Sequence, residues 1–326
     1  MIVDAVRTPI GKRNGGLSTL HPAQVLGAVQ KAIIERTGID PALVDQVVGG
    51  CVSQVGEQAF NLTRTAWLAA GLPLTTAATT VDTQCGSSQQ ATSLASALVG
   101  SGVVDVALSC GVELMSRIPI GVGGSKALGL GIPIPPTYFA QYEMTSQFEG
   151  AERIADKWGI TREDTDAFGF ASQQRAAQAW AEDRFSGQYI TIDAPDRNED
   201  GTLADTFHTV ARDEGLRETT MEKLASLKPV GRENGVHTAG NSSQISDGAS
   251  AVREALLTVS SDWPFMVSKD TAAEYARYRA HLHAHATREI AGALASGRRD
   301  QAQKLADGWN RADGLFGALD ARRLPR

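Results

Sequence analysis

Apolar residues in the first third of the chain fall into short buried runs that alternate with helical faces. Residues 2–6 (IVDAV) predict a buried strand, and a helix is predicted to follow, with Pro22 in its first turn and Gly38 at its end. Its apolar face consists of Val25, Leu26, Val29, Ile33 and Ile34. Further strands are predicted at 45–52, 79–83 and 104–110, and further helices at 61–70 and 86–99. This alternation predicts an α/β fold with a mostly parallel βαβαβαβ sheet.

The pattern changes after Arg117. A stretch rich in Gly and Pro is followed by two amphipathic helices and a long polar region, which we interpret as an inserted loop domain. The first of these helices is predicted to end at Gly159, and Thr161 with Asp164 forms a capping box for the second. Glycine turns and the start of another strand return at 236–252.

The last part of the chain is predicted to be helical. From Ser268 to Gly297 apolar residues recur at helical spacing, and this tail is basic whereas the remainder of the chain is acidic. The predicted organisation is an α/β domain (1–117 and 236–252), an inserted loop domain (118–235) and a helical tail (253–326).

The composition narrows the class of protein. With 326 residues, of which 42% are hydrophobic and 21% charged, the chain is long enough for two domains with apolar cores. Its net charge of -6 gives no electrostatic basis for binding nucleic acid or an anionic membrane. No apolar run reaches the ~18 residues of a membrane span. Three cysteines without a CxxC pair argue against a disulfide framework or a zinc site. We therefore expect a soluble, cytoplasmic protein.

One cysteine is distinguished by its position. Cys85 lies between a predicted strand and a helix that begins with small residues. There it meets the positive end of the helix dipole and unpaired backbone N–H groups, which favour a thiolate and stabilise a carbonyl oxygen that becomes negative. These are the requirements of an acyl-transfer nucleophile. The alternative is an inert structural cysteine, because free cysteines are among the most buried residues.

Several separate motifs occur in order along residues 1–252. They are AVRTPIGK, VDTQCGSSQQA, GVELMSR, AERIADKWGITREDTDAF and HTAGNSSQISDGAS. Together they resemble the thiolases, which cleave or form 3-ketoacyl-CoA. The resemblance implies a thiolase-like fold in which Cys85 accepts the acyl group and the inserted loop domain binds coenzyme A. It assigns the contacts with coenzyme A to Met144, Arg217, Ala239 and Ser243. It also implies acyl-CoA and coenzyme A as substrates, no separate cofactor, and a homo-oligomer that is a dimer or tetramer.

Each binding assignment has a plainer alternative. Arg217 suits a phosphate, but most arginines are solvated surface charges. The small residues from Ala239 onward either lie against a pantetheine arm or form a glycine turn that enters a strand. His237 either approaches the ligand or is an ordinary histidine at a strand end. Glu143 stands where thiolases usually have a histidine, immediately before Met144.

The resemblance to thiolases ends near Val252. The second half of a thiolase contributes Asn-Glu-Ala-Phe, Gly-His-Pro and Cys-x-Gly motifs, and none of them occurs after Val252. General acid–base help is typically worth about a hundredfold to ten-thousandfold, so poor turnover is expected. Because Arg253 and Glu254 replace the apolar residues with which thiolases continue the strand, we also expect a shortened edge strand and uncovered apolar surface.

Residues 253–326 have a resemblance of their own. The run REALLTVSSDWPFMVSKDTAAEYARYRAHLHAHATREI is similar to the C-terminal helical part of α-1,4-glucan branching enzymes of the glycoside hydrolase 57 kind. This indicates a tail of different origin, and it assigns no catalytic residue. Trp263 is either a remnant of a sugar-facing wall or an aromatic anchor between helices. In the run of His281, His283 and His285 only the outer two share a helix face, so no metal site is expected.

Three functions are compatible with the sequence. The first is a thiolase-family acyltransferase, fused to a foreign tail and impaired in turnover, whose Cys85 reacts faster than Cys51 and Cys110. The second is a non-catalytic module that binds coenzyme A or a partner protein. The third is a role of the tail in glucan metabolism. Thiol labelling, acetyl-CoA binding without turnover, and binding to glycogen distinguish them.

Overall fold

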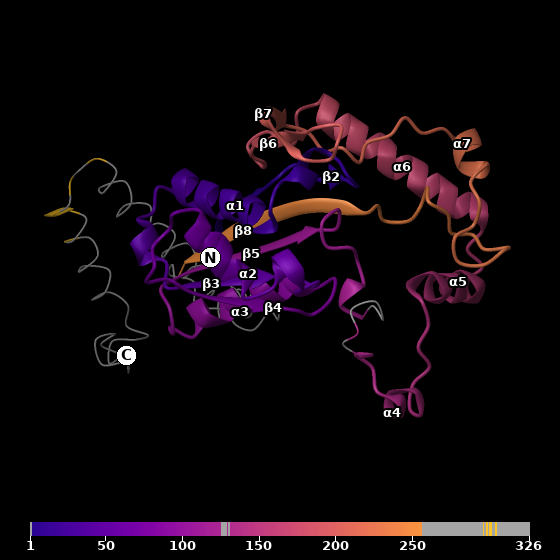
Figure 1. Ribbon diagram of the computed structural model, residues 1–326, viewed down its shortest axis with the longest axis horizontal. Coiled ribbons are helices and arrows are strands. Elements are labelled where there is room, and N and C mark those ends of the chain that lie inside the picture. Colours follow the sequence, from indigo (N-terminus) through magenta and orange to yellow (C-terminus); the bar gives the residue numbers. More distant parts are fainter. Residues whose placement is uncertain are drawn as a thin grey trace, which may run out of the picture.

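The computed structural model describes residues 2–124, 129, 131–255, 296, 298, 300, 301 and 304. Its centre is a 6-stranded sheet in the order β1-β8-β5-β3-β4, with β2 paired to β8 outside this row (Figure 1). The strands are β1 (Ile2–Arg7), β2 (Gly11–Lys12), β3 (Gln46–Gly50), β4 (Ala77–Val81), β5 (Val106–Leu114) and β8 (Ser246–Ala255).

The direction of β8 makes the sheet mixed. β3 is parallel to β4 and to β5, whereas β8 is antiparallel to β1, β2 and β5. The predicted α/β class is confirmed, and β1, β3, β4 and β5 run in one direction beside the reversed strand.

β8 is not the shortened edge strand that the sequence predicted. It lies between β1 and β5 and continues past Val252, where Arg253 pairs with Asp4 on one side and Leu108 on the other. The sheet ladder consists of backbone N–H and C=O groups, so a change in side-chain character at Arg253 does not end the strand.

Helices cover both faces of the sheet. Successive side chains of a strand point to opposite faces, and here both faces carry apolar side chains. Val47 of β3 and Leu108 of β5 belong to the main apolar cluster, under α1 (Pro22–Thr37) and α2 (Leu62–Ala69). Their neighbours Val48 and Ala107 belong to a second cluster, under α3 (Ser87–Gly100). The sheet body therefore has three layers, with α1 and α2 on one side and α3 on the other.

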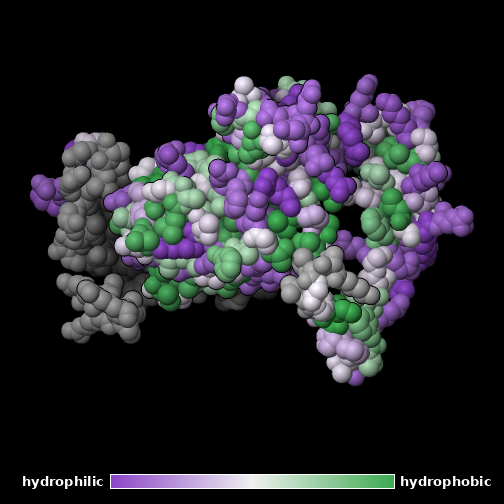
Figure 2. Space-filling view, in the orientation of Figure 1, coloured by the Kyte–Doolittle hydropathy of each residue, from purple (hydrophilic) through white to green (hydrophobic). Residues whose placement is uncertain are grey.

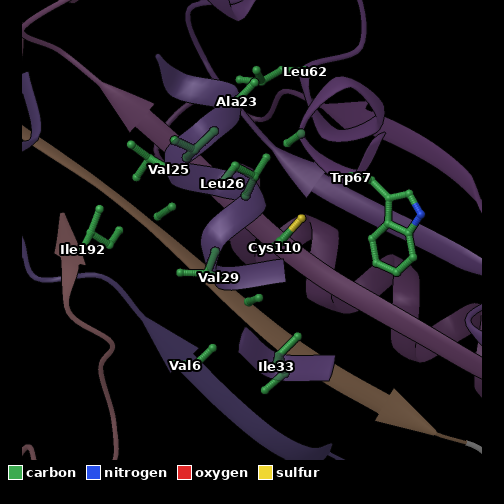
Figure 3. Packing of buried hydrophobic residues seen from close by; sticks show 14 of the residues in the cluster. Val6, Ala23, Val25, Leu26, Val29, Ile33, Leu62, Trp67, Cys110 and Ile192 are labelled. Atoms are coloured by element: carbon green, nitrogen blue, oxygen red, sulfur yellow. The ribbon is translucent and has the colours of Figure 1, made fainter. Parts of the chain in front are cut away.

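α1 presents the apolar face that its sequence predicts. Figure 3 shows Val25, Leu26, Val29 and Ile33 of α1 in the main cluster, together with Trp67 of α2 and Cys110 of β5. The helix begins at Pro22 and ends at Gly38, whose φ of 61° is a left-handed conformation without steric cost for glycine.

The region between β5 and β8 includes α4 (Pro136–Phe139), α5 (Gln147–Trp158), α6 (Arg162–Ala181), β6 (Ile192–Arg197), β7 (Leu203–Val210) and α7 (Met221–Ala225). Gly159 ends α5 and a capping box of Thr161 with Asp164 begins α6, both as predicted. The antiparallel pair β6 and β7 was not predicted.

In Figure 1, α4 and α5 stand away from the sheet. Figure 2 shows hydrophobic residues on the surface near α4, where Phe139 is exposed.

Arg7 joins the end of β1 to the segment that follows α6. Its guanidinium makes two hydrogen bonds to the Asp213 carboxylate, at 2.7 and 3.0 Å, and lies over the ring of Phe185 at 5.2 Å. Trp180 of α6 donates its Nε1–H to the same carboxylate at 3.2 Å. The charge pair and the ring contacts fasten the carboxyl end of α6 to the sheet body.

Within the described residues, no helix is both long enough and apolar enough to cross a membrane. Trp263, His281, His283 and His285 lie outside the described residues, as does nearly all of the predicted helical tail.

Candidate active site

Cys85 lies in the turn that joins β4 to α3. β4 ends at Val81 and α3 begins at Ser87, so this cysteine follows a parallel strand and precedes a helix N-terminus, as predicted. Its thiol is free and exposed. The N-cap residue of α3 is Gly86, so no side chain caps the first turn. The N–H groups of Gly86 and Ser87 donate to the C=O groups of Thr83 and Gln84, at 3.2 and 3.0 Å, and Cys85 lies beside the positive end of the helix dipole.

Side chains on both sides of Cys85 hold the turn. The Oγ of Ser87 accepts a hydrogen bond from the N–H of Thr83 at 3.0 Å and donates one to the C=O of Gln84 at 2.5 Å. Asp82 Oδ1 accepts from the N–H of Gln84 at 2.6 Å. Gln84 has a φ of 54°, a left-handed conformation that few residues other than glycine adopt. The residue before the thiol is thus fixed in an uncommon conformation.

Two glycines let the first turn of α3 lie directly on the sheet. A Cβ built on Gly50 of β3 would lie 2.5 Å from the carbonyl carbon of Ser87 and closer still to the nitrogen of Ser88. A Cβ on Gly111 of β5 would overlap the Oγ of Ser88. A side chain at position 50 would push away the helix end that follows Cys85, and one at position 111 would displace the Ser88 hydroxyl.

The other two cysteines are buried. Burial raises the pKa of the Cys51 thiol to about 12, and the charge of Glu113 contributes to the increase. Burial also raises the pKa of Cys110 to about 12. Since the thiolate is the nucleophile, neither residue is suited to acyl transfer at neutral pH.

At pH 8 and under native conditions, iodoacetamide is expected to alkylate Cys85 alone. A thiol with a pKa of about 12 is thiolate in only about one molecule in ten thousand at pH 8, which applies to Cys51 and Cys110. Peptide mass spectrometry after a timed reaction measures each site. Guanidinium chloride should make all three thiols react, which is the control. Equal labelling of the three in the native protein would contradict the assignment.

Three of the predicted coenzyme A residues lie on segments that pack against α6. The N–H of Arg217 donates to Gln173 Oε1 at 3.0 Å, and Arg217 itself is exposed. Next to Ala239, Gly240 packs closely on Gly169 of α6. A Cβ built on Gly169 would lie 2.6 Å from the carbonyl oxygen of Gly240. Ala239 is exposed, so it presents a small surface beside α6.

Ser243 is joined to the same region through its neighbour. Gln244 donates its Nε2–H to the C=O of Gly215 at 2.9 Å, and Gly215 lies two residues before Arg217. Ser243 is exposed. Arg217, Ala239 and Ser243 therefore lie on adjoining segments, although they are separated in the sequence.

Met144 lies apart, on the segment between α4 and α5, and its side chain is 57% exposed. The preceding residue, Glu143, pairs with Arg153 of α5 at 2.6 Å. Among the described residues, no hydrogen bond or ion pair connects Cys85 with Met144, Arg217, Ala239 or Ser243. The structure groups three of the four residues predicted to bind coenzyme A but does not join them to Cys85.

His237 contacts a buried carboxylate rather than the cysteine. Its Nδ1 lies 3.1 Å from Glu152 of α5, which is 2% exposed. Glu152 also accepts the N–H groups of Val236 and His237, at 3.1 and 3.0 Å. Burial alone would raise the pKa of Glu152, but these hydrogen bonds and His237 hold it below its usual value. His237 does not lie at the end of a strand, because β8 begins at Ser246.

Sequence reasoning missed two residues of the cysteine turn, Asp82 and Ser87. An Asp that accepts the N–H two residues later forms an Asx turn, so Asp82 was open to recognition from its position after a strand. Ser87 was identified only as a small helix residue. Its two hydrogen bonds are local, to Gln84 and Thr83 three and four residues earlier, a pattern that serine side chains commonly form with nearby backbone groups.

Comparison with known proteins gives two matches for different parts of the chain. Residues 1–253 match the family "Thiolase, N-terminal domain". Residues 237–323 match the family "1,4-alpha-glucan branching enzyme, C-terminal". The two matches overlap at 237–253, which includes most of β8.

Individual relatives follow the same division. A steroid 3-ketoacyl-CoA thiolase of Mycobacterium tuberculosis is 41% identical over 257 residues, which are 77% of this chain and 60% of that protein. A crystal structure of the Bacillus anthracis acetyl-CoA acetyltransferase superposes with a TM-score of 0.68 at 32% identity, covering 78% of this chain and 64% of the other. A probable 1,4-alpha-glucan branching enzyme of M. tuberculosis is 87% identical over 75 residues, 23% of this chain and 14% of that protein. This chain therefore spans less than two thirds of these relatives.

Proposed function

Because this chain belongs to the thiolase family, as the match over residues 1–253 shows, we propose that Cys85 accepts an acyl group from an acyl-CoA thioester. The observation that carries the proposal is the contrast among the three cysteines. Cys85 is exposed at the N-terminus of α3, whereas Cys51 and Cys110 are buried and have raised pKa values.

The proposed step is a thioester exchange. The Cys85 thiolate attacks the carbonyl carbon, and the electron pair of the C=O bond moves onto the oxygen. The helix N-terminus beside Cys85 supplies partial positive charge that stabilises such an oxyanion. When the C=O bond forms again, the bond from carbon to the coenzyme A sulfur breaks. Coenzyme A leaves as a thiolate and takes a proton from solvent, and an acyl-Cys85 thioester remains.

Coenzyme A is proposed to bind along the segments that pack on α6. The exposed guanidinium of Arg217 suits a phosphate, and the small exposed residues Ala239 and Ser243 leave room for a thin pantetheine arm. Met144 is assigned to the thioester end. Coenzyme A acts here as a substrate, and no separate cofactor is proposed. Association into a dimer or tetramer is part of the same proposal.

The reaction class proposed is thiolytic cleavage of 3-ketoacyl-CoA or its reverse, Claisen condensation, with slow turnover. The histidines after Val252 lie in the run HLHAH and not in a Gly-His-Pro sequence, and no cysteine follows Val252. Acid–base groups are typically worth about a hundredfold to ten-thousandfold, so the second half-reaction is expected to be slow. Acyl-Cys85 should therefore accumulate.

Acylation is tested by incubating the full chain with acetyl-CoA and measuring released thiol and the mass of the Cys85 peptide. We expect release of up to one coenzyme A per chain and one acetyl group on that peptide. Cys85→Ser should show neither, and Cys110→Ser, a change at a buried thiol, should retain both. Alkylation of Cys85 by iodoacetamide without any acetylation would contradict the proposal and favour a module that only binds coenzyme A.

A second candidate function rests on the 87% identity to a branching enzyme over 75 residues. On this alternative the chain acts in glucan metabolism through its tail. Co-sedimentation of the full chain with glycogen or amylose tests it. Binding that survives Cys85→Ser would support this function, and failure to bind either polymer would dispose of it.

A further inference from the structure

We propose that Ser87 is a positioning residue for Cys85, acting by holding Gln84 in its left-handed conformation. The inference rests on the proposed function, because it concerns how the nucleophile is presented. Ser87 does not touch a substrate in this proposal. It acts through the backbone of the residue that precedes the thiol.

The Ser87 hydroxyl is both donor and acceptor inside the turn, and its Oγ also lies 3.5 Å from Asp82 Oδ1. It accepts from the N–H of Thr83 at 3.0 Å and donates to the C=O of Gln84 at 2.5 Å. The residue is only 4% exposed, so water does not compete freely for these groups. The hydroxyl thus links the first turn of α3 to the two residues that precede Cys85.

Gln84 is the strained element of the turn. Its φ of 54° belongs to a region that only a few per cent of non-glycine residues occupy. Such conformations persist when the surrounding structure holds them. Besides the Ser87 hydroxyl, the backbone N–H of Ser87 donates to the C=O of Gln84 at 3.0 Å. Asp82 accepts the N–H of Gln84 at 2.6 Å and its side-chain Nε2–H at 3.4 Å. Release of Gln84 would turn the following residue, Cys85, away from the N-terminus of α3.

Ser88 provides a matched control. It is adjacent to Ser87 on α3 and carries the same hydroxyl, yet no hydrogen bond of its Oγ is found among the described residues. Ser88→Ala therefore removes a hydroxyl from the same helix turn without changing the bonds that hold Gln84. A general effect of altering the helix terminus would appear in both variants, whereas the proposed effect should appear only in Ser87→Ala.

The Gln84→Gly variant distinguishes a role of Ser87 in positioning Cys85 from a role in the general stability of α3. Without the Ser87 hydroxyl, only Asp82 and the Ser87 N–H still hold glutamine at a positive φ that it disfavours, whereas glycine adopts a positive φ about as readily as a negative one. Removal of the hydroxyl should therefore matter when residue 84 is glutamine and matter little when it is glycine. A role of Ser87 confined to the stability of α3 would not depend on residue 84.

The test is the rate of iodoacetamide alkylation of Cys85 in a double-mutant cycle of Ser87→Ala and Gln84→Gly. With Gln84 in place, Ser87→Ala is expected to slow alkylation by about fivefold or more, since the thiol loses its place beside the helix terminus. On the Gln84→Gly background, the same change should alter the rate by no more than about twofold. Ser88→Ala should stay within about twofold of the unchanged protein.

Cys51 and Cys110 report folding in the same samples, because they react only when the core opens. An equal effect of Ser87→Ala on both backgrounds, or a rate unchanged with Gln84 in folded protein, would overturn the proposal. If Ser87→Ala by itself exposes the buried thiols, the comparison between Gln84→Gly and the double variant is used instead. A fivefold fall in the alkylation rate of Cys85 between these two proteins would overturn the proposal. Transfer from acetyl-CoA is measured separately. Normal alkylation without acetylation would refute the proposed function and leave the positioning role intact.

Discussion

Gly50→Ala is expected to destabilise the protein by about 3 kcal/mol and to slow alkylation of Cys85. The added methyl group would lie 2.5 Å from the carbonyl carbon of Ser87, and this backbone atom cannot move without displacing α3. A loss of that size should lower the melting temperature by about 6–12 °C. Thermal unfolding followed by circular dichroism and timed thiol labelling measure the two effects.

Gly100→Ala is the matched control for this prediction. Gly100 ends α3, and a Cβ built there meets no atom within 4 Å. Alanine has a higher helix propensity than glycine, so the variant should be as stable as the unchanged protein or more stable by up to about 1 kcal/mol. If Gly50→Ala unfolds at the same temperature as Gly100→Ala, α3 does not rest on β3 as described.

Glu152→Ala is expected to cost about 3–5 kcal/mol of unfolding free energy. The variant removes the buried carboxylate that accepts the part-buried N–H groups of Val236 and His237. The same substitution at Glu163, an exposed residue in the first turn of α6, should cost less than about 1 kcal/mol. Chemical denaturation of the three proteins measures the difference. Equal costs at the two positions would show that the buried carboxylate does not hold the 231–237 segment.

Glu152→Gln gives this contact a pH dependence of known sign. The pKa of Glu152 is lowered in the fold from an ordinary value of 4.5. Its ionised form therefore contributes stability that is fully present above pH 4.5 and is lost as the pH falls through the lower, folded value. The stability difference between the unchanged protein and Glu152→Gln should shrink as the pH falls below 4.5. A difference that grows on acidification would contradict the assignment.

Elements with local signals were predictable from the sequence. Pro22 and Gly38 bound α1, and Thr161 with Asp164 begins α6, because caps involve residues only a few positions apart. The position of Cys85 between strand and helix was predictable for the same reason. β6 and β7 were missed because charged and polar residues mask the alternation that would identify them as strands.

The features that shape the site depend on contacts between distant residues. The need for glycine at position 50 arises from Ser87 and Ser88 of another element, and no local pattern records it. The buried Glu152 has an ordinary helical sequence context. Its role as an acceptor depends on Val236 and His237, which come more than 80 positions later in the chain. The grouping of Arg217 with Ser243 was implied only by family resemblance, since the intervening segments fold onto α6 in three dimensions.

The register of β1 and β8 has a consequence for chain connectivity. Ile2 pairs with Glu254, so the first described residue lies beside the strand end from which the tail departs. A linker of a few residues would suffice to join the two strand ends into a hairpin and close the sheet body into a ring. New ends could then be opened at the exposed turn around Gly201, between β6 and β7. A circular permutation of this kind would change the order of the segments along the chain and keep the pairing of the strands.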